Sequence, residues 1–231
     1  MANEAITHSV SHQLKLGLSG QKVLYAVLDK NHQVLTRGER YLTDSKSLQD
    51  ILDRDDVLSN IYSHTDLIVI SPKYVVAPEE IARQDHDYKL YKLSNKSNPD
   101  ERLFRDHSQE QKETQYSGPR EFLRLLKNKY PNMGKRHVSS FFNERIQALE
   151  SQQEYRIQLF FGAEFLYLTI SKSEELLLNN SYHCNNAQDI FYYTMLAVEQ
   201  LKIDPRECEL FLYQEIALEH SLNDLFKNYM Q

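Results

Sequence analysis

Two glycine turns are the places in this sequence where backbone amides and small side chains could bind an anion. They are Ser19-Gly20-Gln21 and Gly162-Ala163-Glu164. Glycine lets the amides of a turn converge on a negative charge, and the first turn adds a serine hydroxyl. These residues are therefore the candidate cleft or ligand-binding residues. A tight hairpin turn also favours glycine without any ligand, so a purely structural role is the alternative.

A basic helix face is the second candidate, and it would bind a partner. Arg120, Arg124 and Lys127 share one face of the helix that should follow Gly118-Pro119. Guanidinium and ammonium groups at this spacing could meet phosphate or an acidic protein. The alternative is a solvated helix face, which is the commoner reason for such charges.

The other residues capable of chemistry do not form a recognisable site. His8 and His12 have helical i, i+4 spacing, but no third metal ligand accompanies them. Tyr182-His183-Cys184 places a base beside a nucleophile, but neighbours on a strand point to opposite faces. The second cysteine, Cys208, makes no metal or redox spacing with the first. The sequence therefore predicts no catalytic residue, no metal and no cofactor.

The composition disfavours several classes of protein. The 231 residues carry a formal net charge of −6, and attraction to phosphates drives most nucleic-acid binding, so we expect no nucleic-acid partner. From Ser151 onward there are 5 Lys and Arg against 12 Asp and Glu, so the acidity is concentrated in the second part. No run approaches the ~20 apolar residues of a membrane-spanning helix. The first residues show no secretory signal and there are only two cysteines, so we expect a cytoplasmic protein.

The elements that must position these residues follow one order twice. Three apolar runs separated by short polar turns predict three strands, a capped amphipathic helix follows, and a short buried strand comes last. This βββαβ pattern occupies residues 14–70 and again residues 155–212.

One constant offset relates the two copies. Gly162 follows Gly20 by 142 positions, and Cys208 follows Asp66 by the same number. The shared order and offset favour an internal duplication over two unrelated hairpins. The expected domains are residues 1–152, a first half with an extra loop and helices over about 72–152, and residues 153–231, a smaller second half.

The segment between the two copies carries additional elements. Residues 74–82 predict an extended piece and a short helix. Residues 94–115 are polar and predict a surface loop. Two helices should follow, one from Pro119 and one over residues 139–150, and a capping box of Ser221 and Asp224 predicts a last helix.

Two runs carry a resemblance to a known family. They are "YVVAPEEIA" at residues 74–82 and "ELLLNNSYHCNNAQDIFYYTMLAVEQLKIDPRECELFLYQEI" at residues 175–216. Both runs resemble a family of bacterial proteins of unknown function, and the resemblance extends over nearly the whole chain. The resemblance implies an α/β fold with mixed sheets, built from two ribonuclease-H-like βββαβ halves as in the actin-like ATPases. More distantly, the chain is similar to the actin-like scaffold of type IV pilus assembly.

The resemblance also bears on activity. In active proteins of that fold each half opens with an Asp-x-Gly turn, whose carboxylate positions magnesium-bound water. Here Leu18 and Phe160 stand two residues before the turn glycines, and neither can bind a cation. We therefore expect a non-catalytic actin-like binding or scaffold protein, a pseudoenzyme that has lost the ATPase carboxylates and has a protein partner. The alternative is a divergent actin-like ATPase or kinase that binds a nucleotide in the interdomain cleft, using an acid such as Glu164.

Overall fold

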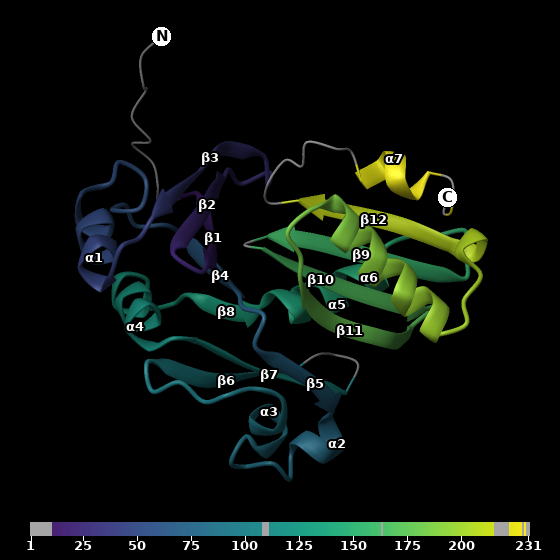
Figure 1. Ribbon diagram of the computed structural model, residues 1–231. Helices are drawn as coiled ribbons and strands as arrows, with labels where there is room; N and C mark the ends of the chain where they lie inside the picture. The colour runs from purple at the N-terminus through teal and green to yellow at the C-terminus, as the bar shows by residue number, and fades with distance from the viewer. Residues whose placement is uncertain (1–10, 108–110, 163, 215–221, 228, 230–231) are drawn as a thin grey trace. The chain divides into compact units, whose positions relative to one another are not determined.

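The chain folds into two compact units. The computed structural model describes residues 11–107, 111–162, 164–214, 222–227 and 229 (Figure 1). Within these residues, the first unit runs to His107 and continues over Gln111–Val138, and the second begins at Ser139.

Helix α5 (Val138–Ala148) therefore opens the second unit, although the sequence predicts the domain boundary at residue 152. The ring of Phe142 on this helix lies 5.3 Å, centroid to centroid, from the rings of both Phe160 and Tyr213. The apolar side chain of Phe142 thus packs against strands of the second sheet, which agrees with the assignment of α5 to this unit.

The first unit is built on a five-stranded sheet with the order β3-β2-β1-β4-β8. β4 runs parallel to β1 and to β8, whereas β2 is antiparallel to both of its neighbours. The sequence misses β8, because "GKRH" shows no apolar alternation. The strands and the two helices beside them are β1 (Gln13–Ser19), β2 (Lys22–Leu28), β3 (Val34–Tyr41), β4 (His64–Ile70), β8 (Gly134–His137), α1 (Ser45–Arg54) and α4 (Arg120–Lys129).

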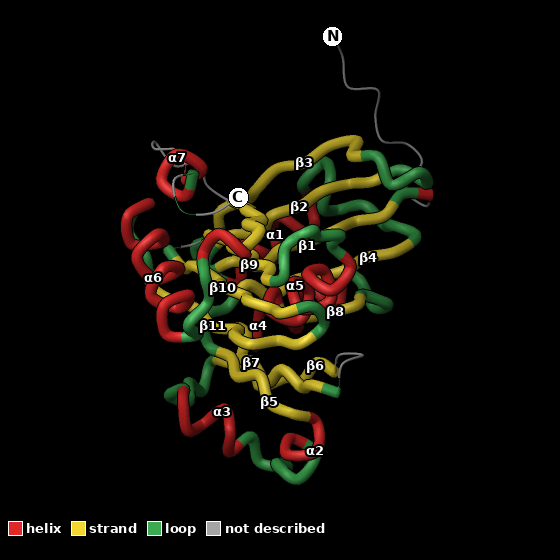
Figure 2. The backbone as a smooth tube through the Cα atoms, turned by 90° about the vertical axis from the view of Figure 1, so that its right-hand side faces the viewer, coloured by secondary structure: helices red, strands yellow, loops and turns green. Residues whose placement is uncertain are grey.

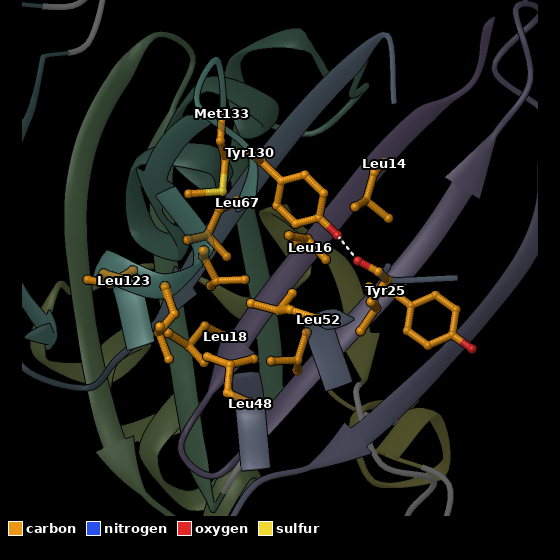
Figure 3. Packing of buried hydrophobic residues seen from close by; sticks show 14 of the residues in the cluster. Leu14, Leu16, Leu18, Tyr25, Leu48, Leu52, Leu67, Leu123, Tyr130 and Met133 are labelled. Atoms are coloured by element: carbon orange, nitrogen blue, oxygen red, sulfur yellow. Dashed lines mark hydrogen bonds between the residues drawn. The ribbon is translucent and has the colours of Figure 1, made fainter. Parts of the chain in front are cut away.

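Alternation along β1 creates the core of this unit. Leu14, Leu16 and Leu18 are each at most 3% exposed and point to the same face, where Leu48 and Leu52 of α1 pack (Figure 3). A capping box between Asp44 and Ser47 fixes the start of α1. The predicted amphipathic helix thus packs its apolar face on the core side of β1.

A separate three-stranded sheet replaces the surface loop predicted for residues 94–115. β6 (Glu101–His107) and β7 (Lys112–Pro119) form an antiparallel hairpin, and β5 (Tyr74–Pro78) pairs with the other edge of β7. The short helices α2 (Glu79–Ala82) and α3 (Lys89–Ser94) pack beside it (Figures 1 and 2). The loop prediction is therefore wrong over both strands of the hairpin.

The sequence pattern does not predict this hairpin, because its interior is polar. Glu113 is 1% exposed and accepts hydrogen bonds from the Arg105 guanidinium at 3.0 and 3.4 Å. The Gln115 amide donates to Glu113 and to Asp85, and Arg105 also donates to the Ala82 carbonyl at 3.1 Å. Such groups are buried only where every charge finds partners, and two of these partners, Ala82 and Asp85, come from a distant part of the sequence.

The second unit contains a four-stranded sheet with the order β11-β10-β9-β12. Ile157 and Leu159 of β9 share an apolar core with Ile190 of α6, whereas Phe160 faces α5 on the other side. Asn186 caps α6, in agreement with the capped helix that the sequence predicts there. Ser221 of the predicted last capping box lies outside the described residues. The elements are β9 (Tyr155–Gly162), β10 (Phe165–Lys172), β11 (Glu175–His183), α6 (Ala187–Gln200), a 3-10 turn (Pro205–Glu207), β12 (Cys208–Gln214) and α7 (Leu222–Phe226).

The predicted order of elements is repeated, but the constant offset of 142 is wrong. Ser19 pairs with Lys22 across the first turn, and Gly162 pairs with Phe165 across the second. Gly162 therefore corresponds to Ser19 and Phe165 to Lys22, and each correspondence is an offset of 143 positions. The helix caps Asp44 and Asn186 still differ by 142.

The change arises between the second and third strands of each unit. Val27 pairs with Thr36, nine positions on, whereas Ile170 pairs with Leu178, eight positions on. The first unit therefore has one extra residue there, and an alignment without gaps places the first hairpins one residue out of register.

A slip of one residue exchanges the two faces of a strand. The structural counterpart of Leu18 is Phe161, not Phe160. Leu18 is 2% exposed and Phe161 is 5% exposed, and each faces the core of its own unit. Both positions are apolar, so the absence of a carboxylate at this point of each repeat does not depend on the register.

Candidate functional site

The first predicted turn is a tight connection between β1 and β2. Ser19 is buried, Gly20 has φ +55° and Gln21 is exposed. Gly20 also borders a cavity of about 300 Å³ whose other lining residues include Ser71, Lys73 and Gly118. The positive φ by itself accounts for the glycine, which agrees with a purely structural role for this turn.

The second turn lies in the other unit and contains less that could bind a ligand. Gly162 ends β9, Ala163 lies outside the described residues, and Glu164 has φ +66° with a side chain that is 76% exposed. The His183 ring lies 3.8 Å from the Glu164 carboxylate. The candidate residues of the two turns remain predictions as ligand-binding residues.

The predicted basic helix face forms one wall of a pocket of about 700 Å³ in the first unit. Arg120, Arg124 and Lys127 of α4 are joined there by Arg102 of β6 and Lys135 of β8. The remaining lining residues are Phe104, Leu123, Asn128 and Met133. The structure thus brings together the three cations that the sequence singles out and adds two that it does not.

Within the described part of the chain, only Arg124 of these five cations has a carboxylate partner. Its guanidinium pairs with Glu121 one helical turn earlier, at 2.5 Å. Lys127 donates to the Met133 carbonyl at 3.4 Å, and the Arg120 guanidinium lies 3.5 Å from the Glu101 carbonyl. The pocket therefore concentrates positive charge that its own side chains do not neutralise, in a protein with a net charge of −6.

Lys135 is the half-buried member of this group. Its Nζ lies 3.7 Å from the centroid of the Phe104 ring and donates to Tyr116 Oη at 2.8 Å. Burial lowers the pKa of Lys135 and the neighbouring Arg102 and Lys127 add to the effect, while Asp106 opposes it. Burial and two neighbouring cations thus disfavour the charged form of Lys135, whereas Asp106 and the Phe104 ring favour it.

A hydrogen-bonded chain from Lys135 through Tyr116 to Asp106 positions the Lys135 side chain. Tyr116 Oη donates to Asp106 at 3.0 Å, and Asp106 also accepts the backbone N–H of His137 at 2.5 Å. The His137 ring is fully buried, with Nε2 2.8 Å from the Ser71 carbonyl, and burial lowers its pKa to about 3. His137 is accordingly a neutral structural residue, and β8 is a rigid support for Lys135.

Lys135→Met is expected to raise the Tm of the protein by about 1–3 °C at neutral pH. Methionine keeps the apolar stem of Lys135 and removes a charge that burial and two neighbouring cations disfavour. Because the pKa of Lys135 is lowered in the folded state, the advantage should shrink as the pH rises through that pKa.

Scanning calorimetry between pH 7 and pH 10 measures this difference. Lys92→Met, at an exposed position of α3, is the control and should change the Tm by less than 1 °C, as an ordinary surface substitution does (about ±0.5 kcal/mol). A lowered Tm for Lys135→Met would show that the ammonium stabilises the fold.

The remaining candidate groups form no site within the residues that the structure describes. Cys184 and Cys208 are buried free thiols, and burial raises the pKa of each to about 11, so neither is an activated nucleophile. His8 lies outside the described residues, so the predicted His8–His12 pair is not described. Among the residues that the structure describes, no group of three or more His, Cys, Asp or Glu side chains could hold a metal ion. None of the described helices is long and apolar enough to cross a membrane.

Solved structures identify the class of fold. A protein from Bacteroides thetaiotaomicron with an actin-like ATPase fold and unknown function is similar to this chain with a TM-score of 0.84 and 17% identity, over 100% of this chain and 91% of that one. The PilM–PilN type IV pilus biogenesis complex contains a chain with a TM-score of 0.61 and 8% identity, over 96% of this chain and 86% of that one. The protein therefore has the actin-like ATPase fold, as predicted.

The chain belongs to the family described as "Protein of unknown function (DUF3822)", which matches residues 2–231. The resemblance to a family of unknown function is thereby confirmed. No curated protein matches this sequence.

Proposed function

We propose that this protein is a non-catalytic, actin-like binding or scaffold protein of the cytoplasm that holds an acidic partner protein at its basic pocket. The observation that carries the proposal is the convergence of five cations from α4, β6 and β8 on one cavity. A ligand with negative charge would relieve the repulsion among them.

The apolar residues at the repeated turns support a binding role over a catalytic one. Leu18 and Phe161 occupy equivalent strand positions and both lie in apolar cores. An ATPase needs a carboxylate near such a turn to position magnesium and water.

Two further observations agree with a cytoplasmic protein that binds another protein. Both cysteines are free and buried, as is usual in a reducing compartment. PilM, which shares the fold, occurs in a complex with PilN.

Charge reversal tests the proposal. Tagged wild-type protein and the double variant Arg120→Glu/Arg124→Glu are expressed in the native cell, and the captured proteins are quantified by mass spectrometry. We expect the variant to recover the main partner at least about tenfold less, because two attractive charges become repulsive.

The matched control is Lys46→Glu/Arg54→Glu on α1, which makes the same change of charge at exposed positions of the same unit. It should leave recovery unchanged. Equal recovery by wild type and by Arg120→Glu/Arg124→Glu would contradict the proposal.

Titration calorimetry with Mg-ATP addresses the alternative, a divergent ATPase or kinase. We expect no binding heat at millimolar ATP. Micromolar binding, or hydrolysis that is lost on replacing Ser19, would favour the alternative.

A further inference from the structure

The basic pocket combines charge with an apolar interior. Phe104, Leu123 and Met133 line it, and the stems of the long cationic side chains extend the apolar surface. Its volume of about 700 Å³ is within the range of small-ligand sites. A ligand that fills it would need both a negative group and an apolar body.

The number and kind of the cations favour a dianion over a single carboxylate. Four of the five have no carboxylate partner among the described residues, and two of those four are arginines, whose planar forks suit bidentate contact with phosphate. A phosphate monoester carries about −1.5 to −2 charges at neutral pH and three acceptor oxygens. A carboxylate carries one charge and two oxygens.

We propose that the pocket binds a phosphate monoester carried on a ring-sized apolar body. The phosphate would lie among Arg102, Lys127 and Lys135, and the ring would lie against Leu123 and Met133. Phosphotyrosine of a partner protein and a free aryl phosphate are two sources of this one chemistry. The inference rests on the proposed function, since it names what the partner presents to the same pocket.

Lys135 gives the proposal a distinctive pH dependence. The groups that face its ammonium are Arg102 and Lys127, which disfavour the charge, Asp106, which favours it, and Tyr116, which accepts its hydrogen bond. A dianion beside Nζ stabilises the charged form of Lys135. At a pH where Lys135 of the unbound protein is partly deprotonated, ligand binding must therefore be accompanied by uptake of a proton. Affinity should therefore fall as the pH rises through the lowered pKa of Lys135, below the range of ordinary lysines.

Titration calorimetry with phenyl phosphate, benzoate and inorganic phosphate tests the site. At pH 7.5 the wild type should bind phenyl phosphate at least about tenfold more tightly than either of the others, because only phenyl phosphate has both the dianion and the ring. Lys135→Met and Arg102→Gln should each weaken that binding about tenfold or more. Lys135→Met should also abolish the fall in affinity between pH 7.5 and pH 10. Arg102 is exposed, so its replacement leaves the fold intact.

A phosphotyrosine peptide and its unphosphorylated form distinguish the two sources. Tighter binding of the phosphopeptide than of phenyl phosphate supports a protein source, and binding of phenyl phosphate alone supports a free compound. Equal affinity for benzoate, no binding of either phosphate ester at millimolar concentration, or binding unaffected by both substitutions would overturn the inference.

The same measurements separate this inference from the proposed function. If no phosphate ester binds but Arg120→Glu/Arg124→Glu still loses its partner, the pocket holds a protein by other acidic groups. If phenyl phosphate binds while partner recovery is insensitive to charge reversal, the site stands and the partner proposal falls.

Discussion

Leu18→Asp is expected to lower the free energy of unfolding by about 4 kcal/mol or more and to create no ATPase activity. This substitution restores the carboxylate that active proteins of the fold carry two residues before the turn glycine. In this chain the Leu18 side chain is 2% exposed and belongs to the same core as Leu48 and Leu52 (Figure 3). An ionised carboxylate would lose its hydration there, and a protonated one would still be buried among leucines. Urea unfolding followed by circular dichroism measures the loss.

Two control variants separate the effect of charge from that of volume and place. Leu18→Met keeps the position apolar and should cost less than about 1.5 kcal/mol. Gln21→Asp puts a carboxylate on the exposed turn three residues later and should change stability by about 0.5 kcal/mol or less. If Leu18→Asp had wild-type stability and bound Mg-ATP, the wild-type turn would be a cation site that lacks only its carboxylate. The non-catalytic proposal would then fail.

Glu113→Ala is expected to destabilise the first unit by about 3–5 kcal/mol. Glu113 is 1% exposed and accepts from both Arg105 and Gln115, so its removal leaves a largely buried guanidinium without its counter-charge. Arg105 would retain its hydrogen bonds to backbone carbonyls, including that of Ala82, and its contact with the Tyr88 ring, but no counter-charge at that position. The measurement is again the midpoint and slope of urea unfolding.

Glu79→Ala is the control, because it removes a carboxylate whose arginine partner is exposed at the surface. The side chain of its partner, Arg83, is 71% exposed, so the loss should stay below about 1 kcal/mol. Glu113→Gln, which keeps the shape and one acceptor, should lie between the two. Equal losses for Glu113→Ala and Glu79→Ala would mean that the buried network adds nothing to stability.

The sequence predicts three of the five cations of the candidate site. Arg120, Arg124 and Lys127 lie on one helix, and helical spacing alone predicts that they share a face. Arg102 and Lys135 come from strands that the sequence analysis assigned to a loop or missed. Nothing in the local pattern of either strand shows that it lies beside α4. The sequence therefore could not predict that these five cations line one pocket.

The sequence by itself determined the twofold βββαβ order, the presence of a capped helix after the third strand and the lack of an acid two residues before either turn glycine. These features depend on the alternation of side chains and on caps within a few residues, which are local properties of the chain. The tertiary structure alone decided the register of the repeat, which one extra residue between the second and third strands shifts from 142 to 143. It also decided that a polar hairpin is buried and that cations from a helix and two strands converge. Those outcomes depend on which distant segments pack together, and burial makes partners of residues that no local pattern relates.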